Sequence, residues 1–337
     1  MEGFSLVPDF PKKVVHGGCG KRELEKTRKN ILDFSASVNP YPPKIPWHCD
    51  PDILSLYPDD QYFTLKERIG QVFHRDPTEI CVGNGSIELI RVFSLVALGK
   101  NKKFFVDPPT FGEYELSAQL SGATRTPVVE KADVVFQCNP NNPTGTLQTK
   151  TDLCRSLDQI SSRNGILFCD EAFIELSDPS ESLITISDSH LFVLRSLTKC
   201  FSIPGIRFGY GFGDPDLIEK IEITRPPWSV NSFAEAFAFE AFRHMDELAA
   251  SRSTIERERV WLTSAINALG LHCAPSTVNY ILVECNQKAA GLCELLSGYG
   301  ILVRDCTSFG MPTSIRVAVR TREENQILVE ALSRCVR

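Results

Sequence analysis

Helical patterns alternate with short apolar runs along the first two thirds of this 337-residue chain, and this alternation constrains its fold more than any other feature. Amphipathic helix-like spacing covers residues 64–74, 86–98, 112–121 and 150–162. Strand-like apolar runs occupy residues 103–106, 134–138, 166–169, 191–194 and 206–211. Strands separated by helices are typical of a parallel sheet with helices on both faces. The sequence therefore predicts an α/β fold with a mostly parallel central sheet.

The last third of the chain has a different pattern. Residues 231–269 read as a long helical segment with little punctuation, and short β runs follow at 278–284, 301–304 and 315–319, separated by helices. A chain of this length also exceeds the size at which one hydrophobic core keeps growing. We therefore expect a second, smaller α+β domain, with the functional site between the two domains.

Composition narrows the classes of function. With 36 Lys and Arg against 42 Asp and Glu, the net charge is −6, which argues against nucleic acid or an anionic membrane as a partner. No apolar run approaches the roughly 20 residues that span a bilayer, and the N-terminus lacks the apolar segment of a signal peptide. The 12 cysteines form no CxxC pair and no zinc-finger spacing, so we expect no metal site, reduced thiols and a cytoplasmic protein.

The most specific string is Asn139-Pro-Asn-Asn-Pro-Thr-Gly145, directly after the strand-like run 134–138. Seven specified positions make chance occurrence on the order of one in a billion per starting site. Turn chemistry alone explains the residue types. It does not explain the two strings that follow.

An acid and an amine follow the next two strand-like runs. Asp170 ends the run 166–169, where an open α/β sheet usually delivers site residues, although an isolated Asp is more often a helix cap. The string Ser196-Leu-Thr-Lys199, with Arg207 eight residues later, supplies an amine, hydroxyls and a guanidinium. Lysine forms imines with pyridoxal phosphate, and arginine is well suited to a phosphate dianion. These residues together predict a site for an aldehyde cofactor that carries a phosphate.

A glycine-rich turn, Gly83-Asn-Gly-Ser86, comes just before a predicted helix. The N-terminus of that helix offers unpaired N–H groups to a phosphate, and Gly85 lets the backbone approach closely. A plain helix cap by Ser86 is the alternative. Convergence with Ser196 and Arg207 favours the phosphate site.

In this order, the motifs resemble those of fold-type-I pyridoxal-phosphate enzymes, the aspartate-aminotransferase fold. The resemblance runs from about residue 16 to residue 337 and is strongest to the branch that holds histidinol-phosphate aminotransferases and threonine-phosphate decarboxylases. Further motifs in the expected order are Asp33-Phe-Ser-Ala-Ser-Val-Asn-Pro40, Tyr57-Pro58 and Pro108-Pro-Thr-Phe111. Those that point to the decarboxylases are His16-Gly-Gly18, Asp170-Glu-Ala-Phe173, Pro227-Trp-Ser-Val-Asn231 and Ile301-Leu-Val-Arg-Asp-Cys306. The resemblance implies an N-terminal arm (1–45) that joins the small domain, a large cofactor-binding domain (46–240) and a C-terminal small domain (241–337).

The resemblance also implies roles in binding pyridoxal 5′-phosphate. Lys199 would hold the aldehyde and Asp170 the ring nitrogen, and these two are the expected catalytic residues. Phe111 would stack on the ring, and Asn142 would bond its phenolic oxygen. Gly85, Ser86, Ser196 and Arg207 would hold the phosphate, and Tyr57 would reach the phosphate of the neighbouring subunit, which makes a homodimer part of the expectation.

For the substrate, the resemblance assigns Arg316 to a carboxylate, and Arg304 with His16 to a phosphate. Asn142 is expected at the same site, and the sequence leaves open how the two arginines divide the two anions. Two positions depart from relatives, which often have tyrosine at Phe173 and asparagine at Ser37. We expect decarboxylation of L-threonine O-3-phosphate to (R)-1-aminopropan-2-yl phosphate, a step of cobalamin biosynthesis.

Three alternatives stay open at the level of sequence. One is a histidinol-phosphate aminotransferase working with 2-oxoglutarate. Another is the same decarboxylation of O-phospho-serine, since one methyl group is worth only about 1–3 kcal/mol of discrimination. A non-catalytic binding protein on this fold is disfavoured because Lys199, Asp170 and Arg207 are all present.

Overall fold

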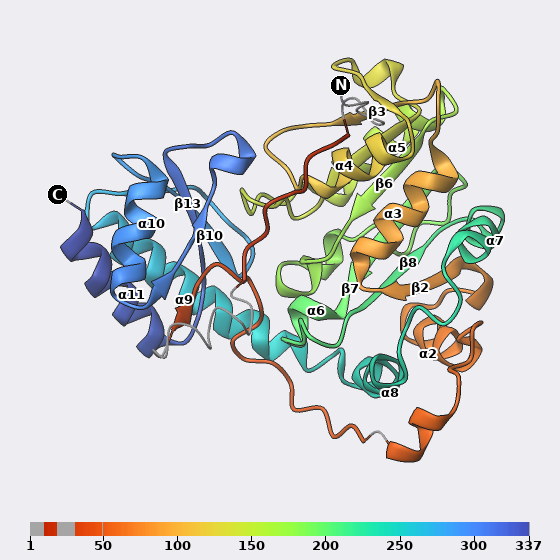
Figure 1. The fold of residues 1–337 in the computed structure, drawn as a ribbon, viewed down its shortest axis with the longest axis horizontal. Helices are drawn as coiled ribbons and strands as arrows, with labels where there is room; N and C mark the ends of the chain where they lie inside the picture. Colours follow the sequence, from red (N-terminus) through yellow and green to blue (C-terminus); the bar gives the residue numbers. More distant parts are fainter. Residues whose placement is uncertain (1–9, 19–30, 49, 337) are drawn as a thin grey trace, which may run out of the picture.

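The computed structural model describes residues 10–18, 31–48 and 50–336, and these form a larger and a smaller part, each around its own sheet (Figure 1). The larger sheet has the strand order β2-β8-β7-β6-β5-β3-β4. Neighbouring strands pair in parallel, except that β8 runs antiparallel to both β2 and β7. The predicted mostly parallel sheet is therefore confirmed. Its strands are β2 (Ile80–Asn84), β3 (Lys103–Val106), β4 (Thr124–Arg125), β5 (Val134–Cys138), β6 (Ile166–Asp170), β7 (Leu191–Ser196) and β8 (Phe208–Phe212).

Helices cover both faces of this sheet because its strands are apolar on both sides. In β5, Val134 and Phe136 belong to one hydrophobic cluster and Val135 to the other, as the alternation of side chains along a strand requires. The first cluster contains residues of α3 (Ser86–Ala97), α4 (Glu113–Leu120) and α7 (Pro215–Thr224). The second contains residues of α2 (Phe63–Phe73), α5 (Lys150–Ser161) and α8 (Ser232–Ala241). The short helix α6 (Leu197–Cys200) follows β7 directly.

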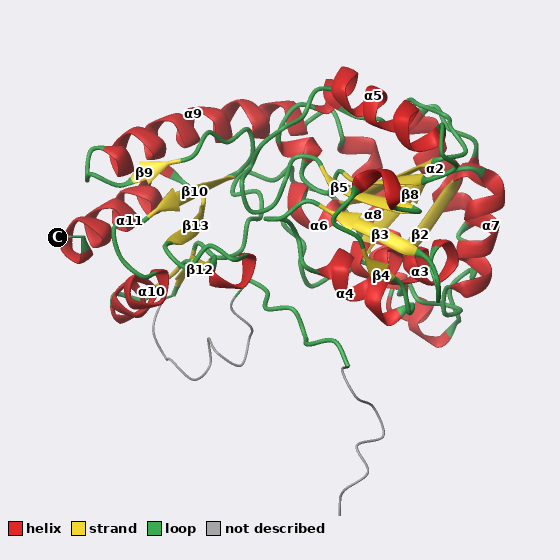
Figure 2. Ribbon diagram, turned by 90° about the horizontal axis from the view of Figure 1, so that it is seen from above, coloured by secondary structure: helices red, strands yellow, loops and turns green. Residues whose placement is uncertain are grey.

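The smaller part is an antiparallel sheet of order β12-β13-β10-β9 with three helices (Figure 2). Its strands are β9 (His272–Cys273), β10 (Tyr280–Glu284), β12 (Arg304–Asp305) and β13 (Ser314–Ala318). Its helices are α9 (Leu248–Asn267), α10 (Ala289–Gly298) and α11 (Arg322–Cys335). Near the N-terminus, β1 (Leu32–Asp33) pairs in parallel with β11 (Ile301–Leu302), and the Ala318 amide donates to the Phe34 carbonyl at 2.8 Å. This segment thus lies against the smaller part, while the exact domain boundaries stay a prediction.

Two sequence expectations for the last third were wrong in detail. The predicted long helix over 231–269 is interrupted by a 3₁₀ turn at Phe242–His244, before α9 begins. No glycine or proline causes the break. The buried residues of α8 pack in the core under the large sheet, whereas α9 runs out across the smaller sheet in a different direction (Figure 1). Tertiary packing therefore requires the chain to turn between them.

The β run predicted at 301–304 is also divided. Ile301 and Leu302 pair with β1, but Arg304 and Asp305 pair with β13 in the antiparallel sheet. Val303 lies between the two pairings, so the chain passes from one sheet to the other there. This crossing brings Arg304 beside Arg316, its direct partner in the β12–β13 register.

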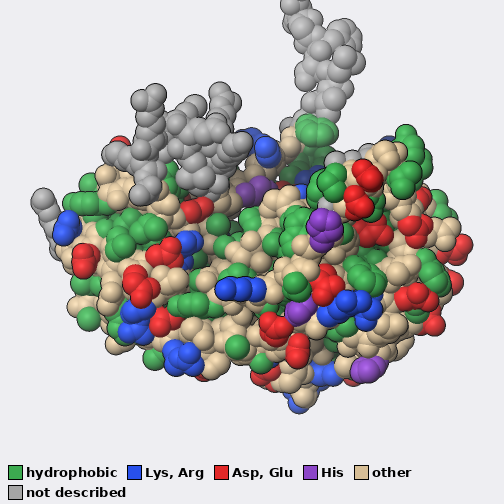
Figure 3. Space-filling view, turned by 90° about the horizontal axis from the view of Figure 1, so that it is seen from below, with side chains coloured by type: hydrophobic (Ala, Val, Ile, Leu, Met, Phe, Trp, Pro, Cys, Tyr) green, Lys and Arg blue, Asp and Glu red, His purple; other side chains and the backbone are tan. Residues whose placement is uncertain are grey.

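Acidic and basic side chains are interspersed on the face drawn in Figure 3, in keeping with the small net charge of the chain. Among the described residues, no helix is both long and apolar enough to cross a membrane. The cytoplasmic location stays a prediction.

Candidate active site

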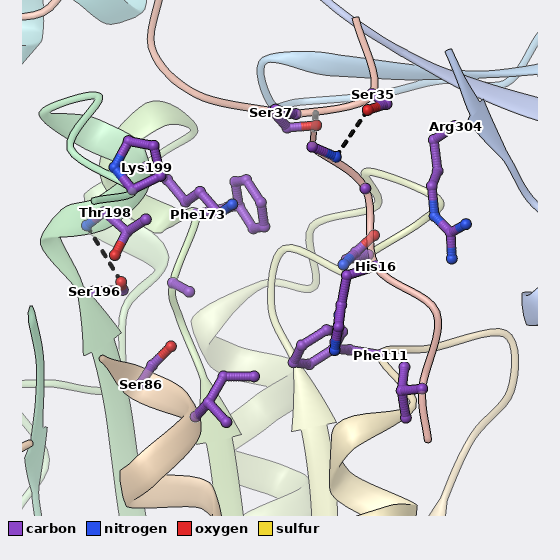
Figure 4. A pocket seen from close by; sticks show the side chains of 18 of the residues that line it. His16, Ser35, Ser37, Ser86, Phe111, Phe173, Ser196, Thr198, Lys199 and Arg304 are labelled. Carbon is purple, nitrogen blue, oxygen red and sulfur yellow. Dashed lines mark hydrogen bonds between the residues drawn. The ribbon is translucent and has the colours of Figure 1, made fainter. Parts of the chain in front are cut away.

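A cavity of about 420 Å³ lies between the two parts of the structure and gathers most of the predicted site residues. Its wall comes from the N-terminal segment, the large sheet and the small sheet. The predicted residues that line it are His16, Ser86, Phe111, Asn142, Asp170, Ser196, Lys199, Arg207, Arg304 and Arg316. Ser86, Ser196 and Lys199 lie on one side, and His16 and Arg304 on the other (Figure 4). Gly85 adjoins this wall behind Ser86, and Tyr57 lies elsewhere.

Sheet topology explains why residues far apart in sequence meet here. The parallel strands β5, β6 and β7 all end at the same edge of the sheet, and site residues lie at or just after the end of each strand. Asn142 lies in the loop after β5, Asp170 is the last residue of β6, and Lys199 lies in α6 after β7. Motifs that follow one another along the chain therefore place their side chains next to one another along this edge of the sheet.

Asp170 is a buried carboxylate held by two donors. The Tyr114 hydroxyl donates to Oδ2 at 2.7 Å, and the Ala172 amide donates to Oδ1 at 2.9 Å. Burial raises the pKa of Asp170 to about 6, while these two hydrogen bonds oppose the shift. The ionised form of this carboxyl group therefore predominates at neutral pH, and it is suited to a cationic ring nitrogen. Tyr114 was not predicted as a site residue, although it lies only three residues after Phe111, on the first turn of α4.

Lys199 is an amine with an altered pKa. Burial lowers the pKa of the Lys199 amine to about 8, and the positive charges of Arg316 and Arg207 lower it in the same direction. Its Nζ lies 5.8 Å from the centre of the Phe173 ring, which closes one side of the cavity. Because the pKa is lowered, a larger fraction of this amine is neutral and nucleophilic at neutral pH.

The residues predicted to hold a phosphate converge around the start of α3. Ser86 is the first residue of this 12-residue helix, and Gly85 before it has φ +77°. A Cβ on Gly85 would collide with the Arg207 guanidinium, and one on Gly209 would collide with the Ser86 backbone. Two glycines, a helix N-terminus, two hydroxyls and a guanidinium thus form a cradle that fits a phosphate dianion.

Replacing Gly85 with alanine should therefore damage this cradle. The residue would need an unfavourable positive φ and would displace Arg207, which together should cost about 1–3 kcal/mol of stability and weaken cofactor binding roughly tenfold or more. Equilibrium titration of the apoprotein with pyridoxal phosphate measures the binding, and thermal unfolding measures the stability. Gly205→Ala is the matched control, since a Cβ there meets nothing within 4 Å. Equal cofactor affinity in the two variants would contradict this assignment.

Two arginines of the small sheet face the same cavity. Arg316 donates through Nη1 to Asn142 Oδ1 and through Nη2 to the Ser35 carbonyl at 3.0 Å, which orients the Asn142 amide. Arg304 donates to the Val15 carbonyl at 2.7 Å and to Ser308 Oγ at 2.6 Å. Arg316 Nε and Ser37 Oγ are buried and have no hydrogen-bond partner among the described residues. Unpaired donors on this wall are what an anionic substrate would satisfy.

His16 reaches the cavity from the N-terminal segment and has a partner, Glu113, that no sequence motif predicted. Its Nε2 lies 2.9 Å from Glu113 Oε1, and Arg91 donates to the other Glu113 oxygen at 2.6 Å. Its ring also lies 5.8 Å from the Phe111 ring. No spacing in the sequence connects residues 16, 91 and 113.

Tyr57 does not join the cavity within this chain. Its side chain is 80% exposed, and its ring lies 4.6 Å from the ring of Trp228. Its expected contact with a cofactor in a neighbouring subunit, and the homodimer itself, stay predictions.

Known proteins resemble this chain over most of its length. The family model "Aminotransferase class I and II" matches residues 43–332. A protein of Caldanaerobacter subterraneus named "Putative threonine-phosphate decarboxylase" is 34% identical, covering 90% of this chain and 92% of that protein. A histidinol-phosphate aminotransferase of Symbiobacterium thermophilum is 31% identical, covering 82% of this chain and 81% of that protein. The crystal structure of the histidinol-phosphate aminotransferase from Clostridium acetobutylicum has a TM-score of 0.77 and 28% identity, covering 84% of this chain and 91% of that one.

The site and the comparisons agree on the class of enzyme. The cavity holds an amine, an ionised acid and a phosphate cradle, which together fit pyridoxal phosphate, and the fold is that of aspartate aminotransferase. The chain belongs to the class I and II aminotransferase family, whose cofactor is pyridoxal 5′-phosphate.

Proposed function

We propose that the protein decarboxylates L-threonine O-3-phosphate to (R)-1-aminopropan-2-yl phosphate, a step of cobalamin biosynthesis. The observation that carries the proposal is the pair of cationic anchors, Arg316 and Arg304 with His16, on the cavity wall beyond Lys199. A phosphorylated amino acid has two anionic groups to be held at once. The 34% identical relative named for this activity supports the same choice.

The residues divide the work by their position. Arg316 lies close enough to Lys199 to lower its pKa, so we assign Arg316 to the carboxylate next to the reacting carbon. Arg304 contacts the N-terminal segment at Val15, next to His16, and both Arg304 and His16 line the cavity. We assign this pair to the phosphate. The bound cofactor supplies an electron sink, which Asp170 supports by keeping the ring nitrogen protonated.

Decarboxylation exchanges a carboxyl group for a proton. The bond between Cα and the carboxyl carbon breaks, CO2 leaves, and a proton must reach the same carbon. Lys199, with its pKa near 8, can both hold and release that proton at neutral pH. Phe173 covers the amine with an apolar ring and brings no hydroxyl of its own, so it adds no second proton donor there.

The second candidate is transamination of histidinol phosphate with 2-oxoglutarate. It is favoured by the 31% identical relative of that name. Arg304 and His16 would then hold the phosphate of histidinol phosphate, and Arg316 would hold a carboxylate only when the keto acid is bound. This candidate therefore leaves one anchor unused in half of the reaction.

A substrate panel separates the two candidates. The cofactor-loaded protein is given O-phospho-L-threonine, O-phospho-L-serine, or histidinol phosphate with 2-oxoglutarate, and CO2 and glutamate are measured. We expect CO2 from O-phospho-L-threonine in amounts equal to the aminopropanol phosphate formed. Glutamate formation from histidinol phosphate without any CO2 from the phosphorylated amino acids would overturn the proposal.

A further inference from the structure

The Glu113 carboxylate links the cavity wall to the protein behind it. Glu113 is the first residue of α4 and only 4% exposed, and it does not itself line the cavity. One of its oxygens faces His16 Nε2 and the other accepts from Arg91, a residue of α3. His16 therefore has a fixed ring orientation, in which only Nδ1 stays available to a ligand.

Charge explains why a buried acid can stand behind an anion-binding wall. By itself, Glu113 would repel a phosphate. Arg91, which does not line the cavity, neutralises the Glu113 carboxylate, and the N-terminus of helix α4 stabilises it further. The pKa of Glu113 is lowered, chiefly by its hydrogen bond with His16, so the group stays a carboxylate. A carboxylate accepts only, so His16 Nε2 carries a proton in this contact, and Nδ1 must carry a second proton to donate to a phosphate oxygen.

We propose that Glu113, held by Arg91, is a positioning residue that keeps the His16 imidazole in place for the phosphate of the substrate, and thereby sets the preference for phosphorylated substrates. The inference rests on the proposed function, because it assigns the phosphate to the wall formed by Arg304 and His16. Arg304 holds the same N-terminal segment from the other side through the Val15 carbonyl. The two contacts pin residues 15 and 16 between α4 and the small sheet.

The substitution Glu113→Gln tests this role sharply. His16 and Arg91 contact different oxygens of Glu113, and an amide keeps an acceptor at only one of these two positions, so in this geometry it can accept from His16 or from Arg91 but not from both. Adding Arg91→Met removes the competing donor and leaves the amide oxygen free for His16. We therefore expect Glu113→Gln to lose the preference for phosphorylated substrates, and the double variant to regain most of it.

The measurement is equilibrium binding of O-phospho-L-threonine and of L-threonine, followed by the absorbance of the bound cofactor, with KM and kcat as a second readout. Glu113→Gln should raise the Kd and KM for O-phospho-L-threonine roughly tenfold to a hundredfold, with kcat within about twofold and L-threonine binding unchanged. His16→Gln should raise the Kd and KM for O-phospho-L-threonine by a similar factor, and combining the two substitutions should raise them no further. Glu115→Gln is the matched control, because Glu115 lies on the same helix and faces Arg125, outside the cavity.

The outcomes separate the inference from the proposed function. If the unaltered protein binds O-phospho-L-threonine no better than L-threonine, both are overturned. If it prefers the phosphorylated compound and Glu113→Gln keeps that preference, only the inference is overturned. Should Glu113→Gln not fold, Glu113→Leu combined with Arg91→Leu removes the buried carboxylate together with the half-buried charge of its partner and should show the same loss of preference.

Discussion

Replacing Lys199 with alanine should lower kcat at least about a thousandfold, with every substrate. We expect this side chain to capture the aldehyde of the cofactor and to carry a proton at the reacting carbon, and proton transfer alone contributes about 10²–10⁴-fold. Reduction with borohydride followed by mass spectrometry should find the cofactor attached to residue 199 in the unaltered protein and to no residue in the variant. Attachment at another lysine would contradict the site described above.

A surface lysine variant and the pH dependence of cofactor capture provide the controls for this experiment. Lys102→Ala removes a lysine that is 54% exposed and paired with Asp133, and should leave kcat within about twofold. In the unaltered apoprotein, the rate of cofactor capture should rise as the pH rises through about 8, because only the neutral amine attacks the aldehyde and its pKa is lowered to that value. A rate that keeps rising toward pH 10.5, the ordinary value for lysine, would show an unperturbed amine.

Asp170→Asn should lower kcat about a hundredfold to a thousandfold while the cofactor stays attached. The substitution keeps the size of the side chain but removes the negative charge that we expect to hold a proton on the ring nitrogen, and preorganised electrostatic groups of this kind contribute about that much. Steady-state kinetics measure the loss. The absorbance of the bound cofactor, titrated against pH, should show a change in the protonation of the ring.

A control acid distinguishes this effect from general damage. Asp133→Asn changes an acid near the surface that pairs with Lys102, and should leave kcat within about twofold. Thermal unfolding checks that Asp170→Asn keeps its fold, which we expect because Tyr114 and the Ala172 amide stay in place around the new amide. A variant that keeps full activity would mean that Asp170 does not face the ring nitrogen.

Site residues at the ends of strands could be predicted from the sequence, whereas the side chains that support them could not. Asn142, Asp170 and Lys199 each lie at or just after the end of a strand, and all three strands are parallel neighbours that end at one edge of the sheet. A pattern of apolar runs followed by polar residues therefore predicts their meeting without knowledge of the packing. The roles carried over from the resemblance rest on the same local motifs, such as Gly85 and Ser86 at the start of α3.

The pattern of apolar runs and polar residues does not predict partners that come from a distant helix. Glu113 meets His16 across 97 positions, and Tyr114 meets Asp170 across 56. Nothing in the spacing of these residues brings them together, because both contacts depend on how α4 packs against the sheet and the N-terminal segment. The break between α8 and α9 has the same origin, since no local residue type ends the helix there.

The sequence by itself determined the α/β class, the smaller second domain and the row of residues at the strand ends, because hydrophobic periodicity and strand-end motifs act over short distances along the chain. Tertiary structure alone decided which side chains support that row. It placed Tyr114 behind Asp170, Glu113 and Arg91 behind His16, and Arg316 against Asn142. These contacts form only when α3, α4, the small sheet and the N-terminal segment pack together. The packing of segments far apart in the chain leaves no local pattern in the sequence.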